Sequence, residues 1–370
     1  MKIALLEPFF TGSHQSWAEG FKAKSRNEIT ILSLHGKHWK WRMHGGAISL
    51  AKQYFELKDR PDLILASDML DLSTFLALTK SSTVGIPTAI YFHENQLSYP
   101  WSMTDMDVRK QRDFHYGFMN WTSMLSADKA FFNSTYNHDS FFKEVGIMLK
   151  AMPDNRELQL IELAQSNSSI LPLGIALSDL TIEISKKDLS KPIILWNHRW
   201  EYDKNPMDFF NAIKHLQMQS VDFGLIVCGE GFEDQPEAFS KIQSEFNNEL
   251  IHFGFAESRA EYKALLHQAN IIPVTSQQEF FGQSVMEAMA AGCFPLLPDR
   301  LAYPDHIPES LKQAFIYSSN EQLQTNLTDI CADLSAVVPL MEAAQGIAMQ
   351  YDWDKIIDHY DDQMEQLARR

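Results

Sequence analysis

One segment in the C-terminal half combines two carboxylates with the start of a predicted helix. It spans residues 276–292, SQQEFFGQSVMEAMAAG, and places Glu279 before the helix and Glu287 inside it. The helix is predicted to begin near Gly282 and to end at Gly292, because glycine suits the left-handed position after a helix. Free N–H groups at a helix start attract an anion such as a diphosphate, and a nearby carboxylate can accept hydrogen bonds from sugar hydroxyls. The alternative is that Glu279 only complements the helix dipole and that Glu287 is a surface charge.

Two cations that follow an earlier apolar run would suit the same anion. Arg199 and Lys204 come shortly after the run at residues 193–197. Arginine offers a planar fork for phosphate oxygens, and lysine offers a point charge. When a sugar–phosphate bond breaks without a metal, cations and helix-terminal N–H groups must stabilise the charge left on the diphosphate. Isolated cations are more often simply exposed, but the strand-end position and the later motif favour a donor site.

Polar residues also follow predicted strands in the N-terminal half, where the strand ends would bring them to one edge of a sheet. They are Gly12, Ser13 and His14 after the first strand, His93, Glu94 and Asn95 after the fourth, and Asn133 at the end of the fifth. Among them, Glu94, Asn95 and Asn133 are candidates for binding the acceptor. The first of these loops lacks the GxGxxG fingerprint, so the sequence gives little support to a dehydrogenase. For His93 the alternative is a buried histidine with satisfied partners.

A further stretch, residues 35–46, mixes cations, tryptophans and glycines. Cations interleaved with aromatic residues suit phosphate contact together with base stacking, which predicts acceptor binding. The alternative is that the tryptophans are packed and the cations solvated. Histidines are present as well, but no cysteine or helix-spaced carboxylate completes a zinc site, so we expect no metal. The candidates are Lys37, Trp39, Lys40, Trp41 and Arg42.

The elements that must position these residues alternate between short apolar runs and longer amphipathic stretches. The predicted strands are residues 2–6, 28–34, 62–66, 88–92 and 129–133, and then 193–197, 223–228, 250–253, 271–274 and 294–297. Such alternation predicts an α/β protein with parallel sheets covered by helices. We predict two doubly wound, Rossmann-like domains, residues 1–175 and 176–348, facing a central cleft. A last helix, residues 349–370, is predicted to return toward the first domain.

The formal net charge of -16 is unevenly distributed along the chain. Residues 1–150 hold 17 Lys+Arg against 15 Asp+Glu, whereas residues 151–370 hold 15 against 33. This difference suggests that the two halves meet different partners. The alternative for the C-terminal half is an acidic surface that only keeps the protein in solution. No run of 18 apolar residues is present, Glu7 interrupts the first apolar stretch, and the three cysteines are scattered. We therefore expect a cytoplasmic protein.

The two glutamates eight positions apart resemble the Glu-x7-Glu motif of retaining, nucleotide-sugar-dependent glycosyltransferases of the GT-B fold. The loop with Arg199 and Lys204, the turn at residues 228–231 and the stretch 253–265 resemble other motifs of that group, in the same order. The resemblance implies a GT-B fold, no metal or other cofactor, and Arg199, Lys204, Glu279 and His93 as catalytic residues. The donor-binding residues that it implies are Gly12, Ser13, His14, Gly229, Phe253, Gly254, Phe280, Phe281, Gly282, Gln283 and Glu287.

Several segments together resemble one family within that group, the tRNA-queuosine mannosyltransferases. They are residues 12–14, 39–43, 92–96 and 197–201. The resemblance implies GDP-mannose as donor and the cyclopentene hydroxyl of queuosine in the anticodon of tRNA(Asp) as acceptor. Neither follows from composition or spacing. Two alternatives stay open: a polysaccharide, lipid-linked or small-molecule acceptor, and a non-catalytic protein that binds nucleotide sugars or RNA.

Overall fold

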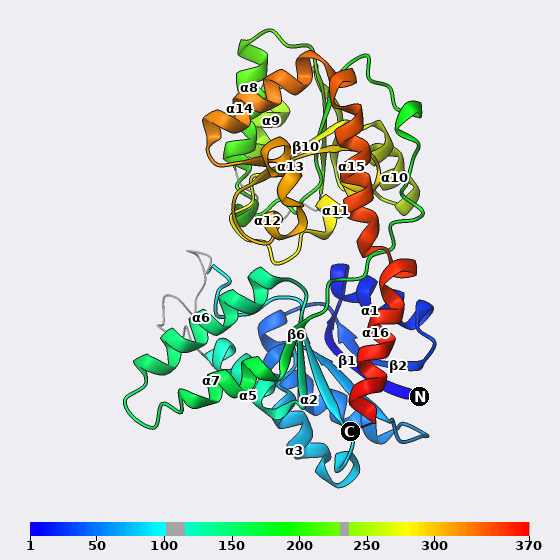
Figure 1. The fold of residues 1–370 in the computed structure, drawn as a ribbon, viewed down its shortest axis with the longest axis vertical. Coiled ribbons are helices and arrows are strands. Elements are labelled where there is room, and N and C mark those ends of the chain that lie inside the picture. The colour runs from blue at the N-terminus through cyan, green and yellow to red at the C-terminus, as the bar shows by residue number, and fades with distance from the viewer. Residues whose placement is uncertain (101–114, 230–236, 370) are drawn as a thin grey trace. The chain divides into compact units, whose positions relative to one another are not determined.

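The computed structural model describes residues 1–100, 115–229 and 237–369 of the chain. These residues form two compact units (Figure 1). Unit 1 comprises Met1–Ile175 together with Trp353–Arg370, and unit 2 comprises Ala176–Asp352. Each unit is built around one parallel sheet of six strands.

The sheet of unit 1 has the strand order β2-β1-β3-β4-β5-β6. Its strands are β1 (Lys2–Phe10), β2 (Glu28–His35), β3 (Leu63–Ser67), β4 (Thr88–Phe92), β5 (Lys129–Phe132) and β6 (Ser168–Ile170). All residues of β3 and β4 are buried, as expected for parallel strands covered by helices on both faces. The register pairs Ile64 with Thr88 and Ala89 with Lys129, so the ends of β3, β4 and β5 lie side by side.

Helices cover both faces of this sheet. They are α1 (Gly12–Lys24), α2 (Trp39–Phe55), α3 (Leu72–Thr83), α5 (His115–Ser126), α6 (Thr135–Ala151), α7 (Gln159–Ser166) and α16 (Trp353–Ala368). Side chains of α2, α3, α5 and α6 share one hydrophobic core with β3, β4 and β5. Asp71 and Ser134 cap α3 and α6 by accepting hydrogen bonds from backbone N–H groups, which satisfies donors that a helix start otherwise leaves unpaired.

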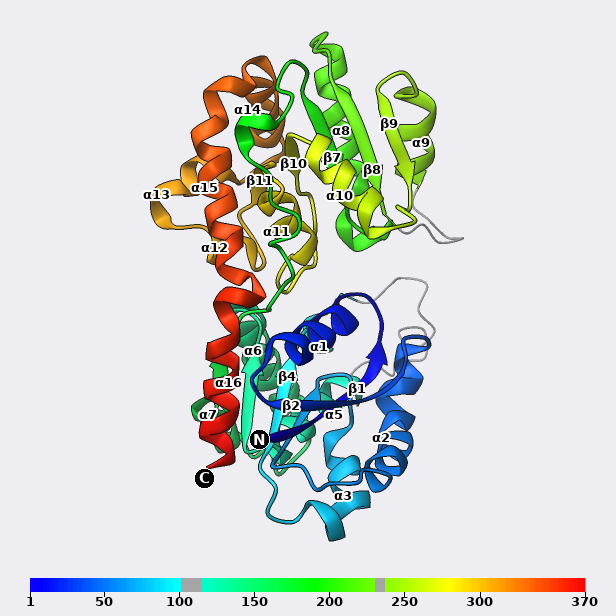
Figure 2. The same cartoon turned by 90° about the vertical axis from the view of Figure 1, so that its right-hand side faces the viewer.

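The last helix, α16, lies beside α1 in unit 1 although it follows unit 2 in the sequence (Figure 1 and Figure 2). Its buried Asp361 accepts hydrogen bonds from the backbone N–H of Arg26 at 2.9 Å and from the side-chain amide of Asn27 at 3.0 Å. Its Tyr360 hydroxyl accepts a hydrogen bond from Trp17 at 3.1 Å. Buried polar contacts of this kind fix the helix in one register on the sheet.

Unit 2 repeats the architecture with the strand order β12-β11-β10-β7-β8-β9. Its strands are β7 (Ile193–Trp196), β8 (Gly224–Cys228), β9 (Leu250–Gly254), β10 (Ile271–Pro273), β11 (Phe294–Pro298) and β12 (Ile316–Tyr317). Its helices are α8 (Pro206–Met218), α9 (Glu237–Glu245), α10 (Arg259–Gln268), α11 (Gln283–Ala290), α12 (Tyr303–His306), α13 (Glu309–Phe315), α14 (Asn320–Ala332) and α15 (Val338–Ala348). The predicted α/β class is confirmed, and all ten predicted strands are present. The short strands β6 and β12 were not predicted.

Within the described residues, no single helix has the length and apolarity needed to cross a membrane. One pair of helices, Asn320–Ala332 and Leu334–Tyr351, reaches the required length and composition only when joined, and it is bent by 105°.

Candidate active site

Two of the residues predicted in unit 2, Lys204 and Glu279, lie close together at the carboxyl ends of two neighbouring strands. Lys204 lies in a short 3-10 turn after β7, and Glu279 lies in the loop between β10 and α11. Because β7 and β10 are adjacent in the sheet, these two loops meet at one edge. The Lys204 ammonium is 3.2 Å from the Glu279 carboxylate and donates a hydrogen bond to the Gln278 carbonyl at 2.8 Å.

Lys204 and Glu279 form a charged pair in a buried setting. Burial lowers the pKa of Lys204, but the carboxylates of Glu279 and Asp203 outweigh it, and the net pKa is raised. Burial raises the pKa of Glu279, but the Lys204 charge and the N–H of Phe281 outweigh it, and the net pKa is lowered. Glu279 accepts hydrogen bonds from the N–H groups of Phe280 at 3.1 Å and Phe281 at 3.3 Å. Both groups are therefore ionised, and the carboxylate is held in one orientation.

Gly282 directly precedes α11 and has a backbone angle that favours glycine. Its φ is +92°, and a Cβ there would lie 3.1 Å from the ring of Tyr303. The next residue, Gln283, begins the helix and donates a hydrogen bond to the Glu287 carboxylate at 3.2 Å. The sequence therefore uses glycine here for conformation and close packing at once.

Arg199 lies in the loop after β7 with about half of its side chain exposed. Its guanidinium is 3.2 Å from the Glu201 carboxylate. The Arg199 charge also opposes protonation of Lys204, after the larger effect of burial, so the two cations are close enough to interact. A diphosphate that binds both cations must compete with Glu201 and Glu279 for them.

Glu287 is buried and held by three other side chains of unit 2. Its carboxylate accepts a hydrogen bond from the Tyr262 hydroxyl at 2.8 Å and pairs with Arg259 at 3.4 Å. The Tyr262 hydroxyl in turn accepts a hydrogen bond from Asn197 at 3.0 Å. Glu287 is thus fixed in place, which excludes the alternative of a free surface charge.

The glycine turn after β8 packs closely against the loop that carries Arg199. A Cβ on Gly229 would lie 2.1 Å from the carbonyl oxygen of His198, so only glycine permits this approach. Glu230 and Gly231, the other members of the predicted turn, lie outside the described residues. Phe253 and Gly254 end β9, and the N–H of Gly229 donates to the Gly254 carbonyl at 3.0 Å.

In unit 1 the predicted strand-end residues surround a buried pair of histidines. The His14 Nδ1 atom is 3.0 Å from the Glu7 carboxylate, and the rings of His14 and His93 are 4.2 Å apart between centroids. The N–H of His93 donates to the Asp68 carboxylate at 2.8 Å. Gly12 and Ser13 form the first turn of α1, beside His14.

The two histidines have opposite protonation states. Burial lowers the pKa of His14, but the carboxylates of Glu7, and to a smaller extent of Asp68 and Glu94, together outweigh it and raise the pKa to about 9. Burial lowers the pKa of His93 well below its usual value, and the charge of His14 lowers it further. At neutral pH His14 is therefore an imidazolium and His93 is neutral. The Nε2 atom of His93 is buried and has no hydrogen-bond partner among the described residues, which is rare in folded proteins unless a ligand completes the site.

The ligand atoms of Glu7, His14 and His93 lie within 4.8 Å of one another, close enough to hold a metal ion. The protonated state of His14 opposes this, because a metal ligand must be a neutral imidazole.

Asn95 and Asn133 use their side chains to support the loop that carries His93. The Asn133 amide donates to the His93 carbonyl at 2.8 Å, and the Asn95 amide donates to Asn137 at 2.8 Å. Glu94 is half-buried and accepts a hydrogen bond from Gln96 at 2.7 Å. In the structure these three residues therefore hold the loop.

The residues predicted from the mixed stretch 35–46 lie at the start of α2, and its two tryptophans differ. Trp39 is half-buried and packs against Tyr116, with 5.1 Å between ring centroids. Trp41 is 62% exposed. Lys37 is exposed and precedes the helix, Lys40 lies over the Trp39 ring at 5.6 Å, and Arg42 donates to a backbone carbonyl at 2.9 Å.

Comparison with known proteins decides the family. Residues 2–175 match the model of the tRNA-queuosine alpha-mannosyltransferase N-terminal domain, and residues 178–334 match glycosyl transferases group 1. The chain is 32% identical over 340 residues to the tRNA-queuosine alpha-mannosyltransferase of Drosophila melanogaster, which covers 89% of this chain and 86% of that protein. The chain belongs to the tRNA-queuosine alpha-mannosyltransferase family. The predicted family and the predicted hexosyltransferase class are confirmed.

Other similarities are more distant. One is a sequence match to less than half of the chain, and the others are likenesses of the fold. The GDP-mannose:cellobiosyl-diphosphopolyprenol alpha-mannosyltransferase of Xanthomonas campestris is 22% identical over 46% of each chain. Sucrose-phosphate synthase from Thermosynechococcus elongatus superposes with a TM-score of 0.71 at 14% identity, covering 99% of both chains. Anabaena HepE in complex with UDP gives 0.68 at 13% identity, covering 99% of this chain and 100% of that one. These structures confirm the GT-B fold.

Three residues of this family member were missed as site candidates. His198 is buried next to Arg199, and its Nδ1 atom is 3.0 Å from the Ser284 hydroxyl. Burial, followed by the Lys204 charge, lowers the pKa of His198 to about 3, so it is neutral. Arg259 and Tyr262 hold Glu287. All three lie in segments that resemble motifs of the group, residues 197–201 and 253–265, but none of them was singled out as a site residue.

Proposed function

We propose that this protein transfers mannose from GDP-mannose to the cyclopentene hydroxyl of queuosine in tRNA(Asp), with retention of configuration. The observation that carries the proposal is the 32% identity, over most of both chains, to a protein named for queuosine mannosylation. The Xanthomonas relative is named for GDP-mannose, although it matches less than half of the chain. An acceptor in tRNA also favours the cytoplasm as the location.

The donor diphosphate is proposed to bind Arg199, Lys204 and the N–H groups at the start of α11. Arg199 presents a half-exposed guanidinium, and Lys204 a buried ammonium held 3.2 Å from Glu279. The diphosphate gains negative charge as the sugar leaves, so cations fixed in advance stabilise the transition state more than the ground state. Phe280, Phe281, Gly282 and Gln283 line the same loop.

Two groups are proposed to orient the mannose. Glu279 is ionised and accepts hydrogen bonds from sugar hydroxyls. His93 is neutral, and its buried Nε2 atom lacks a partner among the described residues, so it suits a hydrogen bond with a hydroxyl group. Glu287 is proposed to hold the ribose of the nucleotide, and Phe253 and Gly254 at the end of β9 are proposed to contact the donor.

The reaction is proposed to proceed without a covalent enzyme intermediate. The bond between the sugar C1 and the phosphate oxygen breaks, and a bond from C1 to the acceptor oxygen forms on the same face. The acceptor proton passes to the departing phosphate oxygen. Arg199 and Lys204 neutralise the charge that develops there.

We propose that the reaction needs no metal, because cations already occupy the role that a metal would have. Activity after treatment with EDTA tests this, with added Mg²⁺, Mn²⁺ or Zn²⁺ as the comparison. Full activity in EDTA supports the proposal. Loss that a divalent ion restores contradicts it and directs attention to Glu7, His14 and His93.

The central experiment measures donor and acceptor separately. The protein is incubated with GDP-mannose, UDP-glucose or UDP-N-acetylglucosamine, first alone and then with queuosine-containing tRNA, and the nucleosides are analysed by mass. A hexose that is added to queuosine from GDP-mannose, and from neither of the other two donors, supports the proposal. Donor hydrolysis without a tRNA product would indicate another acceptor, and binding without hydrolysis a non-catalytic protein.

Arg199→Ala serves as the matched inactive variant in this experiment. Loss of one transition-state cation is expected to reduce kcat by about 100- to 1000-fold. Its circular dichroism should be unchanged, because the Arg199 side chain is half-exposed. Normal turnover in this variant would refute the assignment of the donor site.

A further inference from the structure

The geometry of α2 points to Trp41 as a residue whose ring is held against the helix and on which a base of the acceptor RNA stacks. This inference rests on the proposed function only for the choice of RNA. The inference goes beyond the proposed function by naming one side chain, the residue that holds that side chain in place, and the mode of contact.

Trp41 lies flat against the helix that carries it. A Cβ built on Gly45 would be 2.8 Å from Cζ2, 3.0 Å from Cε2 and 3.1 Å from Cη2 of Trp41. These positions are one helical turn apart, and side chains at i and i+4 lie on the same face. One face of the indole therefore covers the backbone at Gly45, while the side chain as a whole stays 62% exposed. The other face of the ring is turned outward.

The glycine at position 45 has no other evident reason. Glycine inside a helix is unfavourable relative to alanine, and α2 contains two in succession. At Gly46 the nearest atom to an added Cβ is Pro8 Cβ at 3.0 Å, which is packing against β1. At Gly45 all three of the nearest atoms belong to Trp41. The helix thus tolerates an unfavourable residue at the one position that lets Trp41 lie flat.

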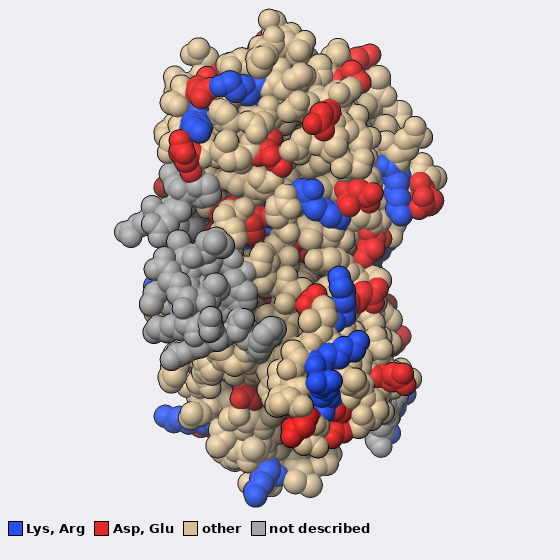
Figure 3. Space-filling view, turned by 90° about the vertical axis from the view of Figure 1, so that its left-hand side faces the viewer, with Lys and Arg blue, Asp and Glu red and all other residues tan. Residues whose placement is uncertain are grey.

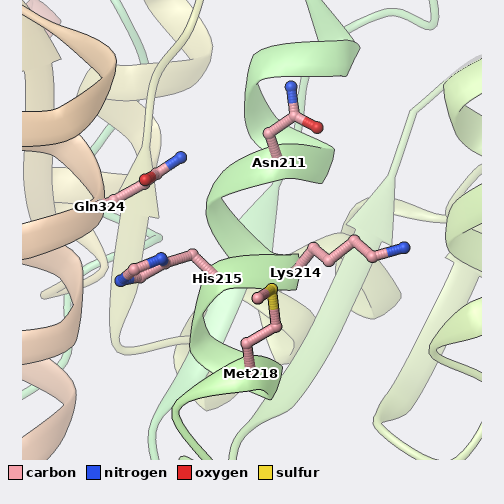
Figure 4. Close-up of a pocket in the computed structure, with 5 residues that line it drawn as sticks. All are labelled: Asn211, Lys214, His215, Met218 and Gln324. Atoms are coloured by element: carbon pink, nitrogen blue, oxygen red, sulfur yellow. The ribbon is translucent and has the colours of Figure 1, made fainter.

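The charge around Trp41 suits a polyanion. Residues 29–55 contain no Asp or Glu, although the chain has a net charge of -16, and the same stretch carries Lys37, Lys40, Arg42 and Lys52. On the face shown in Figure 3, acidic and basic side chains are interspersed. An acid-free stretch around an exposed aromatic ring is therefore a local feature. Cations that track phosphates and a ring on which a base stacks are the usual elements of single-stranded nucleic-acid binding.

Trp39 does not share this arrangement. Its ring packs against Tyr116 and the cluster around Met43 and Met69, so it stabilises the start of α2. The two tryptophans of the mixed stretch therefore divide their roles: Trp39 is packed, and Trp41 contacts the ligand. Ile48, 64% exposed on the same helix, offers a matched control because it is equally open but cannot stack on a base.

The test compares four variants of the full-length protein in binding and turnover. The dissociation constant is measured for queuosine-containing tRNA and for the isolated anticodon stem-loop, and kcat and the two KM values are measured in steady state. Trp41→Ala is expected to raise the tRNA dissociation constant and KM by about tenfold, from the usual contribution of one stacked base. The KM for GDP-mannose and kcat should stay within about twofold. Trp41→Phe keeps an aromatic face and should lose less than Trp41→Ala.

Gly45→Ala makes the test independent of side-chain removal. The added methyl group displaces the indole without removing any group that contacts RNA, and alanine strengthens the helix. Weaker tRNA binding with an unchanged or higher melting temperature is expected, and Ile48→Ala should bind tRNA as the wild type does. Circular dichroism and donor affinity identify any variant that fails to fold, in which case Trp41→Phe and Gly45→Ala decide.

The outcomes separate this inference from the proposed function. Wild-type tRNA affinity in both Trp41→Ala and Gly45→Ala would overturn the stacking platform, even if queuosine is mannosylated. RNA binding that depends on Trp41 in a protein that does not mannosylate queuosine would support the platform and refute the function. An equal loss in Ile48→Ala would show a general apolar contact and overturn the stacking mode.

Discussion

The ion pair between Glu7 and His14 predicts that unit 1 loses stability as the pH rises into the alkaline range. Glu7→Gln removes the carboxylate charge while keeping the shape of the side chain. The pKa of His14 is about 9 in the folded protein, against an ordinary value of 6.5. A folded pKa that is raised favours the folded state below 6.5, and this contribution is lost as the pH rises through 9. At about 1.4 kcal/mol per pH unit, the full contribution is about 3 kcal/mol.

The effect has a definite pH profile. From a folded pKa of about 9 in the wild type and a neutral His14 in the variant, the pH-dependent advantage of the wild type over Glu7→Gln is about 4 kcal/mol at pH 6, about 1.4 kcal/mol at pH 8 and near zero at pH 10. In the variant, burial and the absence of the carboxylate keep His14 neutral throughout. Asp68 and Glu94 also raise the pKa of His14, but less than Glu7 does.

Hydrogen exchange measured by mass spectrometry suits this prediction because two units need not unfold together. Opening free energies are compared for peptides from β1 and α1, after correction for the intrinsic pH dependence of exchange. Peptides from β8 in unit 2 serve as the internal reference and should show no difference between the variants. A constant difference between pH 6 and pH 10 would refute the assignment of His14 as an imidazolium. So would a His14 that titrates near 6.5 by NMR.

Three further predictions concern the donor site and the last helix. Lys204→Met leaves Glu279 without its cation, so the pKa of Glu279 should rise, and kcat should fall by about 100-fold or more in the hexose-transfer assay; near-normal kcat would contradict the role of Lys204. Glu201→Gln releases Arg199 from a competing carboxylate 3.2 Å away, so the KM for GDP-mannose should fall severalfold in steady state, and an increase would show that Glu201 positions Arg199. Asp361→Ala leaves hydrogen-bond donors of the turn before β2 unpaired, so the free energy of unfolding of unit 1 should fall by roughly 3 kcal/mol. Limited proteolysis should then cleave α16 earlier, and unchanged protection would exclude an anchoring role for Asp361.

The strands were predictable because a covered parallel strand is apolar along its whole length. The residues at 88–92 and 271–274 are of this kind, and both became buried strands. The strands β6 and β12 escaped prediction because three residues, or two, are too few for any periodicity. Their position depends on pairing with β5 and β11, which is a tertiary effect.

The sequence named several residues that the fold brings together, but it did not show which contacts each of them makes. Lys204 was named from its place after a predicted strand and Glu279 from its place before a predicted helix, and the structure brings them together because β7 and β10 are adjacent. Arg259 had no such signal, since a surface-type cation at a helix start is common and only the fold brings it to Glu287. Asn95 and Asn133 were named as ligand contacts, but a sequence cannot show that their amides are used by the loop that carries His93.

The acidic surplus of residues 151–370 is compatible with the anion-binding site that we propose in the same half, because the cations of that site are already paired with carboxylates. Arg199 lies beside Glu201, and Lys204 lies between Asp203 and Glu279 at 3.2 Å from each. Carboxylates that neutralise these cations remove part of the attraction for a diphosphate in the ground state. They also fix the cations in position, so that little reorganisation is needed when charge develops on the leaving group. In the proposed reaction, cations that need little reorganisation stabilise the developing charge on the leaving group, and stabilisation specific to the transition state is what accelerates a reaction. We therefore propose that the carboxylates around Arg199 and Lys204 position these cations for the reaction.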